Sequence, residues 1–197
     1  METALELAKK KGFTPIFACE CIENSESVLK TSSLVVVCDY SLVFFTKTPV
    51  QEKQSYNWMI VKQLTVRKDS LSITFGKKTI KITPDNFQEF FGVIKHVLIQ
   101  LFTENELFEI NGAIFLGVTE VHSPKAALIR YSGLSRAAKK IVAPSNVTTL
   151  SKLLETRPND LDFTIFSDPF YVIPFVLKAI QVCPYIRTLS MNDCNTG

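Results

Sequence analysis

The feature that most constrains the fold is a pair of apolar segments between Ser33 and Phe45, SLVVVCDYSLVFF. β-Branched and aromatic residues dominate both segments, and Asp39, Tyr40 and Ser41 separate them. Such short apolar runs around a polar break are typical of strands joined by a tight turn. The sequence therefore predicts a buried β-hairpin around which the neighbouring chain is organised.

Further strand-like segments lie on both sides of the hairpin. The alternation around Cys19–Ile22 predicts a strand before it, and 56–66, 70–75 and 79–82 predict strands after it. The polar segment 46–55 predicts a solvent-exposed connection. We therefore expect six or seven antiparallel strands with short loops.

A helix is expected immediately after these strands. Thr83 can cap it, Pro84 suits its first position, and Asp85 favours the positive end of the helix dipole. Apolar residues then recur at three- and four-residue steps: Phe87, Phe90, Phe91, Ile94, Leu98, Leu101 and Phe102. The pattern predicts an amphipathic helix over 84–103, and residues 2–11 also have a helix-forming composition.

The patterns are weaker between this helix and residue 160. The apolar segment 113–121 predicts an extended stretch. Gly133 interrupts the mixed segment 125–142 and Pro144 closes it, so we expect two short helices there. A further helix is expected over 147–154.

The end of the chain contains an internal echo, because Leu161–Phe163 recurs as Leu189–Met191 after 28 residues. Leucine-rich repeats place apolar residues at +0, +3 and +5 and Asn or Cys at +8. The second copy fits with Ile186, Leu189, Met191 and Cys194. The first has Pro158 and Phe166 at +0 and +8, as in an atypical capping repeat. Because about three or more repeats are needed for a stable array, we expect the array to be cut off at Gly197.

Charge is distributed unevenly along the chain, whose formal net charge is +3. Residues 47–95 carry nine Lys or Arg against four acids, and 122–157 carry seven against one. Residues 104–120 carry four acids and no base. This distribution favours an anionic partner at particular places. The aromatic residues sit at core-periodic positions, which disfavours nucleic acid.

Six basic residues fall in the predicted turns of the β-rich part: Lys47, Lys53, Arg67, Lys68, Lys77 and Lys78. Charged turn residues are most often only solvated. Gathered at one open end of a barrel, they would form a patch for anionic lipid. A second basic group would extend the patch: Lys125, Arg130, Arg136, Lys139 and Lys140.

No catalytic or cofactor site is expected. The five cysteines form no regular framework, and those in strand-like segments are typical of buried free thiols, which indicates a reducing, cytosolic context. No apolar segment follows a basic start at the N-terminus, so no signal peptide is expected. The Cys19–Cys21 pair has no second pair at zinc-finger spacing. His96 suits a helix-surface or a core-filling role rather than catalysis. No glycine loop for phosphate is present. We expect no enzyme, no metal and no cofactor.

These segments resemble a pleckstrin-homology (PH) domain over residues 13–105. The resemblance rests on the hairpin SLVVVCDYSLVFF, the strand WMIVKQLTV, the basic Gly76–Lys78 turn and the helix that follows. With a helical linker (106–157) and the first leucine-rich repeats (158–197), the chain resembles the N-terminal portion of CARMIL proteins, regulators of actin capping protein. The resemblance implies an α+β fold: a PH-like antiparallel β-barrel capped by a C-terminal helix, then the start of an α/β leucine-rich-repeat solenoid.

Two departures limit what the resemblance implies. Phosphoinositide-binding PH domains carry Lys and Arg on the first two strands and their loop, whereas CECIENSESVLK has three glutamates and only Lys30. Specific inositol-phosphate recognition is therefore not expected. The capping-protein-binding segment of CARMIL proteins lies beyond their repeats, so this chain alone is not expected to regulate capping.

The predicted function is a non-catalytic cytoskeletal adaptor at the cytoplasmic face of the plasma membrane. Its PH-type domain would make weak, non-specific contact with anionic lipids, and its repeats would bind proteins, including actin-regulatory ones. The alternative is a PH-like module for protein–protein interaction or dimerisation that binds no lipid.

Overall fold

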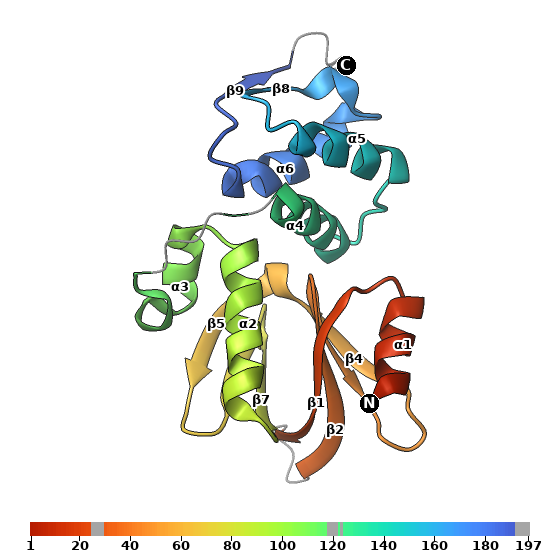
Figure 1. Ribbon diagram of the computed structural model, residues 1–197, viewed down its shortest axis with the longest axis vertical. Coiled ribbons are helices and arrows are strands. Elements are labelled where there is room, and N and C mark those ends of the chain that lie inside the picture. Colours follow the sequence, from red (N-terminus) through yellow and green to blue (C-terminus); the bar gives the residue numbers. More distant parts are fainter. Residues whose placement is uncertain (25–29, 118–121, 123, 192–197) are drawn as a thin grey trace. The chain divides into compact units, whose positions relative to one another are not determined.

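The computed structural model describes residues 1–24, 30–117, 122 and 124–191, which form two compact units, 1–118 and 119–197 (Figure 1). Each unit has its own buried core. The three-part division into 13–105, 106–157 and 158–197 stays a prediction, because compactness does not by itself delimit a linker or a repeat. No helix in the described part of the chain is long and apolar enough to cross a bilayer.

The first unit is built on a seven-stranded antiparallel sheet with three helices. Its elements are α1 (Glu2–Lys10), β1 (Pro15–Asn24), β2 (Lys30–Cys38), β3 (Ser41–Phe45), β4 (Glu52–Asn57), β5 (Val61–Val66), β6 (Leu71–Phe75), β7 (Lys78–Pro84), α2 (Phe87–Leu101) and α3 (Glu104–Phe115), with a 3₁₀ turn, η1 (Trp58–Ile60), between β4 and β5. The predicted α+β class is confirmed. The seven strands agree with the six or seven expected, and an antiparallel sheet followed by a helix is the order of elements that the PH resemblance implies.

Strand β1 joins the two halves of the sheet, whose order is β4-β3-β2-β1-β7-β6-β5. It pairs with β2 from Pro15 to Asn24, but with β7 only over Cys21–Asn24. The hairpin predicted over Ser33–Phe45 is β2 and β3, in which Leu34 pairs with Phe45 and Val37 with Leu42. The sheet therefore turns at β1, with β4 and β5 as its edge strands.

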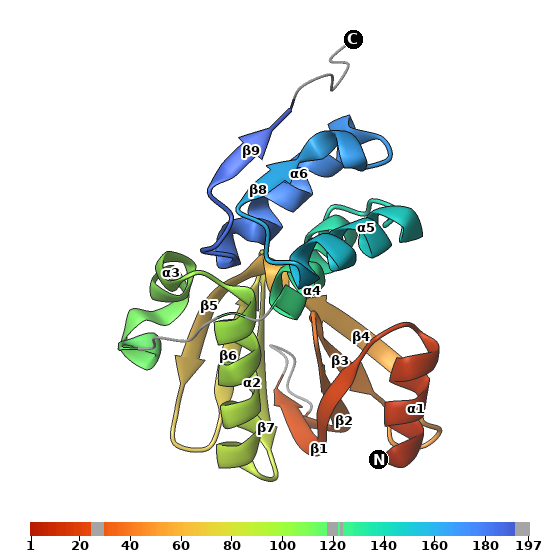
Figure 2. The same cartoon turned by 45° about the horizontal axis from the view of Figure 1, so that its top comes forward.

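Helix α2 lies over β1 and β7 and covers one face of the sheet (Figures 1 and 2). Its fully buried side chains include Phe90, Ile94 and Leu98, as its apolar periodicity predicts. The helix begins three residues later than predicted, because the Asn86 side chain caps it by accepting from the Glu89 amide. Pro84 instead ends β7.

Helix α1 packs against one face of the β2–β3 hairpin. Ala4 and Ala8 of α1 share a buried cluster with Leu34, Val36, Cys38, Val43 and Phe45. Each strand of the hairpin is thus buried on both faces, and α1 covers one of these faces. Burial on both faces explains why β2 and β3 are nearly continuous apolar runs rather than alternating ones.

Two expectations for the segment 46–66 are wrong. The single strand predicted over 56–66 is broken by η1, where Asn57 accepts a hydrogen bond from the Met59 amide. The connection predicted over 46–55 contains most of β4, which pairs with β3 along its polar sequence. Pairing supplies the backbone hydrogen bonds of an edge strand whatever its side chains are.

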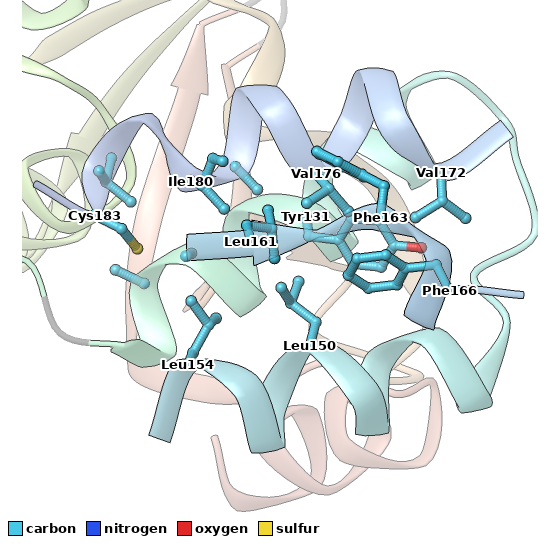
Figure 3. Close-up of a cluster of buried hydrophobic side chains, with 14 residues drawn as sticks. Tyr131, Leu150, Leu154, Leu161, Phe163, Phe166, Val172, Val176, Ile180 and Cys183 are labelled. Atoms are coloured by element: carbon cyan, nitrogen blue, oxygen red, sulfur yellow. The ribbon is translucent and has the colours of Figure 1, made fainter. Parts of the chain in front are cut away.

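The second unit packs three helices against a small parallel sheet. Its elements are α4 (Pro124–Ala137), α5 (Pro144–Glu155), β8 (Asp160–Asp162), η2 (Phe163–Ile165), α6 (Pro169–Ala179), η3 (Ile180–Val182) and β9 (Thr188–Ser190). Figure 3 shows side chains of α5, β8 and α6 converging on one core, among them Leu150, Leu161 and Val176.

Strands β8 and β9 pair in parallel, with Leu161 opposite Leu189 and Asp162 opposite Ser190. The 28-residue spacing between the two similar sequence segments therefore matches the register in which β8 and β9 pair. Phe166, at the +8 position of the first copy, is buried in the core of the unit. Cys194, at the corresponding position of the second copy, lies outside the described residues. A leucine-rich solenoid stays a prediction.

Helices replace two other predicted features. The stretch 113–115, expected to be extended, belongs to α3, whose start has a capping box between Thr103 and Glu106. The two short helices expected over 125–142 are one helix, α4, which continues through Gly133. Gly133 is buried, and packing against α5 and α6 supports the helix where glycine weakens it.

Candidate functional site

The candidate site is the part of the first unit where side chains of β1, β4 and β7 meet. Cys19, Cys21 and Glu23 alternate along β1, and all three are buried. A carboxylate in an apolar lining needs partners, since burying an unpaired charge is costly. Lys53 of β4 donates to both Glu23 oxygens at 3.1 and 3.2 Å, and Gln54 Nε2 donates to Oε2 at 2.9 Å.

The same interactions extend to β7. Gln54 Oε1 accepts hydrogen bonds from the Tyr56 hydroxyl at 2.9 Å and from Lys78 Nζ at 3.2 Å. Lys78 Nζ also lies 5.2 Å from the centre of the Tyr56 ring, which stacks on Phe75. We call Glu23, Lys53, Gln54, Tyr56 and Lys78 the Glu23 cluster. It links edge strand β4 to β1 and β7 through side chains.

Lys47 is neutralised in a similar way on the outer face of β1. It forms an ion pair with Glu20, and both side chains are partly exposed. A pair of this kind contributes about 1 kcal/mol or less to stability. Two of the three glutamates in CECIENSESVLK thus hold two of the predicted lipid-binding lysines, while Glu26 lies outside the described residues.

The other predicted site residues do not gather at one end of the sheet. Arg67 and Lys68 are exposed in the turn before β6, where the Arg67 amide bonds to the Ser70 carbonyl. Lys77 is exposed in the turn after β6. The length of β6 separates the two turns, since its first residue pairs with Val66 and its last with Lys78.

The expectation that all six basic residues lie in turns is wrong for two of them. Lys53 lies within β4, and Lys78 begins β7. The structure brings these two together through Gln54, and it leaves Lys47, the Arg67–Lys68 pair and Lys77 at separate places. Their role in lipid binding stays a prediction.

The buried thiols of β1 and β2 are poor nucleophiles. Burial, with the nearby carboxylates of Asp85 and Glu89, raises the pKa of Cys19 to about 12. Burial, with Asp39, raises the pKa of Cys38 to about 12, and burial also raises the pKa of Cys21. Thiolates are the reactive and metal-binding form of cysteine. Among the described residues, no group of three or more His, Cys, Asp or Glu is placed to hold a metal ion.

Sequence reasoning missed the contact that protects edge strand β5. Asn111 interrupts the helical dihedrals of α3 with φ −170° and ψ 94°. Its side-chain amide donates to the Leu64 carbonyl of β5 at 2.8 Å. The T-E-N-E sequence from Thr103 to Glu106 is a capping-box signature that would have revealed α3. The contact between Asn111 and β5 has no local signal.

No protein-family model matches the sequence, and no curated protein matches it. Solved structures with a similar arrangement include the C-terminal domain of an unknown protein from Leishmania infantum. It is 12% identical with a TM-score of 0.39, and the match covers 49% of this chain and 92% of that one.

Two further similar structures are human. The N-terminal PH domain of ARAP2 is 12% identical with a TM-score of 0.37, and the match covers 54% of this chain and 88% of that one. The DH/PH domain of ARHGEF11, solved with RhoA and its inhibitor, is 9% identical with a TM-score of 0.39. The match covers 47% of this chain and 30% of that one. At TM-scores below 0.4, these likenesses carry neither fold nor function over to this chain. The resemblance to CARMIL proteins stays a prediction.

Proposed function

We propose that this chain is a non-catalytic adaptor whose first unit makes weak, non-specific contact with anionic lipids. The observation that carries the proposal is the exposure of Arg67, Lys68 and Lys77 in turns on either side of β6. Each basic group near an anionic membrane contributes about 1 kcal/mol, so three separated cations support a weak, salt-sensitive interaction.

The Glu23 cluster argues against tight binding of a single phosphoinositide headgroup. Lys53, one of the cations predicted for lipid, already has both oxygens of a buried carboxylate as acceptors. A multiply charged headgroup at this place would meet the negative charge of Glu23. The contact proposed here is therefore with the membrane surface and not with one lipid.

Co-sedimentation of the 197-residue chain with phosphatidylserine-containing vesicles tests the proposal. We expect binding at low salt that falls as salt is raised. Replacing Arg67, Lys68 and Lys77 by Ala should weaken it more than replacing three exposed lysines elsewhere in the unit, Lys9, Lys10 and Lys62. Glu23→Gln removes the charge that neutralises Lys53 and should strengthen binding about fivefold. Absence of binding at low salt, or binding indifferent to salt, would contradict the proposal.

The second candidate is a PH-like module for protein contact or dimerisation without lipid binding. The charge balance favours it, because residues 1–118 contain thirteen Lys and Arg and thirteen Asp and Glu, which provide no net attraction to a membrane. This candidate predicts no vesicle binding. It also predicts dimers in sedimentation velocity, or a partner in pull-downs, that is lost with Ile16→Ser and Ile22→Ser on the exposed side of β1.

We further propose that 158–197 begins a leucine-rich-repeat array that binds proteins at the cytoskeleton, as in CARMIL-type capping-protein regulators. The in-register pairing of Leu161 with Leu189 supports a repeat of 28 residues. Leu189 and Met191 are exposed and available to a partner. Pull-down of actin-regulatory proteins by the 197-residue chain, and its loss with Leu189→Ser and Met191→Ser, would test this. Equal recovery of actin-regulatory proteins by the unsubstituted chain and by this double variant would contradict the proposal.

A further inference from the structure

The turn that ends α4 has a lysine where a glycine would fit better. The Lys139 amide bonds to the Arg136 carbonyl and the Lys140 amide to the Ser135 carbonyl, both at 2.9 Å. This is a Schellman ending of a helix, which places the residue after the last turn in the left-handed region. Lys139 has φ 55° there. Glycine is favoured at this position because any side chain is strained.

The same turn exposes a large apolar side chain. Ile141 is 97% exposed, more than any other large apolar residue in the described part of the chain. Next to it, Lys140 Nζ lies 5.4 Å from the centre of the Tyr171 ring, and Tyr171 is itself exposed. Two cations and a fully exposed aliphatic side chain are therefore consecutive in the chain at 139–141, and one of the cations lies over an amphipathic aromatic ring.

The chain segment that contains residues 139–141 is rich in positive charge. Residues 122–157 contain seven Lys and Arg and one acid. Arg130, one of the basic residues predicted to extend the lipid patch, is fully buried and bonds to the Lys178 carbonyl. The exposed charge is carried by Arg136, Lys139 and Lys140 at the end of α4 and by Lys125 near its start.

We propose that residues 136–141, with Tyr171, form a contact site for the surface of an anionic bilayer. Ile141 enters the boundary between headgroups and acyl chains, and Lys139 and Lys140 lie at the level of the lipid phosphates. The Tyr171 ring lies at the interface, where aromatic residues with a polar end are favoured. A bilayer satisfies both halves of this chemistry, whereas phosphates of a nucleic acid would leave Ile141 in water.

The site shares the anionic-membrane role proposed above but lies in the second unit. The two proposals therefore fail separately. The Arg67, Lys68 and Lys77 variant tests the turns of the sheet, and variants at 139 and 141 test this site. The absence of all vesicle binding by the unsubstituted chain would overturn both.

Lys139→Gly provides the sharpest test, because it removes a charge and relieves backbone strain at once. We expect this variant to be at least as resistant to heat as the unsubstituted chain, yet to bind phosphatidylserine vesicles about fivefold more weakly. Lys152→Ala, which removes an exposed lysine from α5, is the matched control and should bind nearly as well as the unsubstituted chain. Unchanged binding by both Lys139→Gly and Ile141→Ser would overturn the proposal.

Insertion of Ile141 can be followed directly with a fluorescent label. A nitrobenzoxadiazole group on Ile141→Cys, with Cys194→Ser and the four described native cysteines buried, should brighten and shift to the blue on anionic vesicles. The same label on Leu116→Cys, exposed in the first unit, should not change. An unchanged signal at position 141 on vesicles that bind the protein would overturn the proposal. The proposal would also be overturned if single-stranded nucleic acid displaced the vesicles and the Lys139→Gly and Ile141→Ser variants no longer bound that nucleic acid.

Discussion

Lys53 Nζ lies 3.1 and 3.2 Å from the two carboxylate oxygens of Glu23, a residue 30 positions earlier in the chain. Glu23 is buried, while about a third of the Lys53 side chain is exposed. The pair therefore has an asymmetric role. Lys53 keeps a buried charge compensated, and in doing so it is no longer an independent cation for a ligand.

Removing Lys53 should destabilise the first unit more than removing the charge of Glu23. Lys53→Ala leaves a buried carboxylate with Gln54 as its remaining described partner. We expect it to lower the free energy of unfolding by about 2 kcal/mol, less than the loss when a fully buried ion pair is broken. Glu23→Gln should cost about half as much, because Lys53 can be solvated. Urea unfolding followed by fluorescence of Trp58, the one tryptophan, measures both. A double variant less stable than Lys53→Ala would contradict this account.

Asn111 should matter more to stability than an exposed asparagine on the same helix. Asn111→Ala removes the hydrogen bond to the Leu64 carbonyl and should cost about 1 kcal/mol. It should also raise the tendency to aggregate, since α3 would hold edge strand β5 less firmly. Asn105→Ala, at an exposed position of α3, is the control. Equal unfolding midpoints for the two variants would argue against a role for this contact.

Arg130 should be essential to the second unit. Its Nε donates to the Lys178 carbonyl at 2.8 Å and an Nη to Gln181 at 3.2 Å, near the negative end of α6. Arg130→Ala should destabilise the unit by about 3 kcal/mol or more, because it leaves a cavity and removes these bonds. Lys125→Ala, at an exposed position of α4, should cost little. Peptide-level hydrogen exchange in α4 and α6 would reveal the difference, and equal protection in both variants would refute the prediction.

The buried thiols should make the first unit less stable at alkaline pH. Burial raises the pKa of Cys19 and Cys38 to about 12, above the ordinary value of 9.0. Below pH 9 the thiols are protonated in both states, so their contribution to stability is fully present. Above it the unfolded thiols ionise first, and the free energy of unfolding falls as the pH rises from 9 toward 12.

Urea midpoints across this pH range, compared with those of a Cys19→Ala and Cys38→Ala double variant, check the prediction. The double variant should lose less stability between neutral and alkaline pH. A thiol reagent at neutral pH should modify Cys19 and Cys38 only upon unfolding, as shown by peptide mass spectrometry. Rapid modification of the folded protein at either position would disprove it.

Prediction from sequence succeeded where short-range patterns decide structure. The apolar runs around Asp39 specify a hairpin, and the periodicity of Phe90, Ile94 and Leu98 specifies α2. Failures occurred where packing overrides local preference: α4 continues through Gly133, and the polar segment of β4 is a strand because β3 pairs with it. The burial of both faces of the hairpin reflects α1, which lies outside the predicted PH-like domain.

The sequence alone determined which residues form the strands of the hairpin and that Leu161 and Leu189 are equivalent after 28 residues. Both follow from hydrophobic spacing, a property of neighbours along the chain. Only the tertiary structure decided which charges are available. Lys47 and Lys53 are paired with Glu20 and Glu23, whereas Lys139 and Lys140 are exposed beside Ile141. Ion pairing depends on distances of a few ångströms between segments far apart in sequence, and spacing along the chain does not encode those distances.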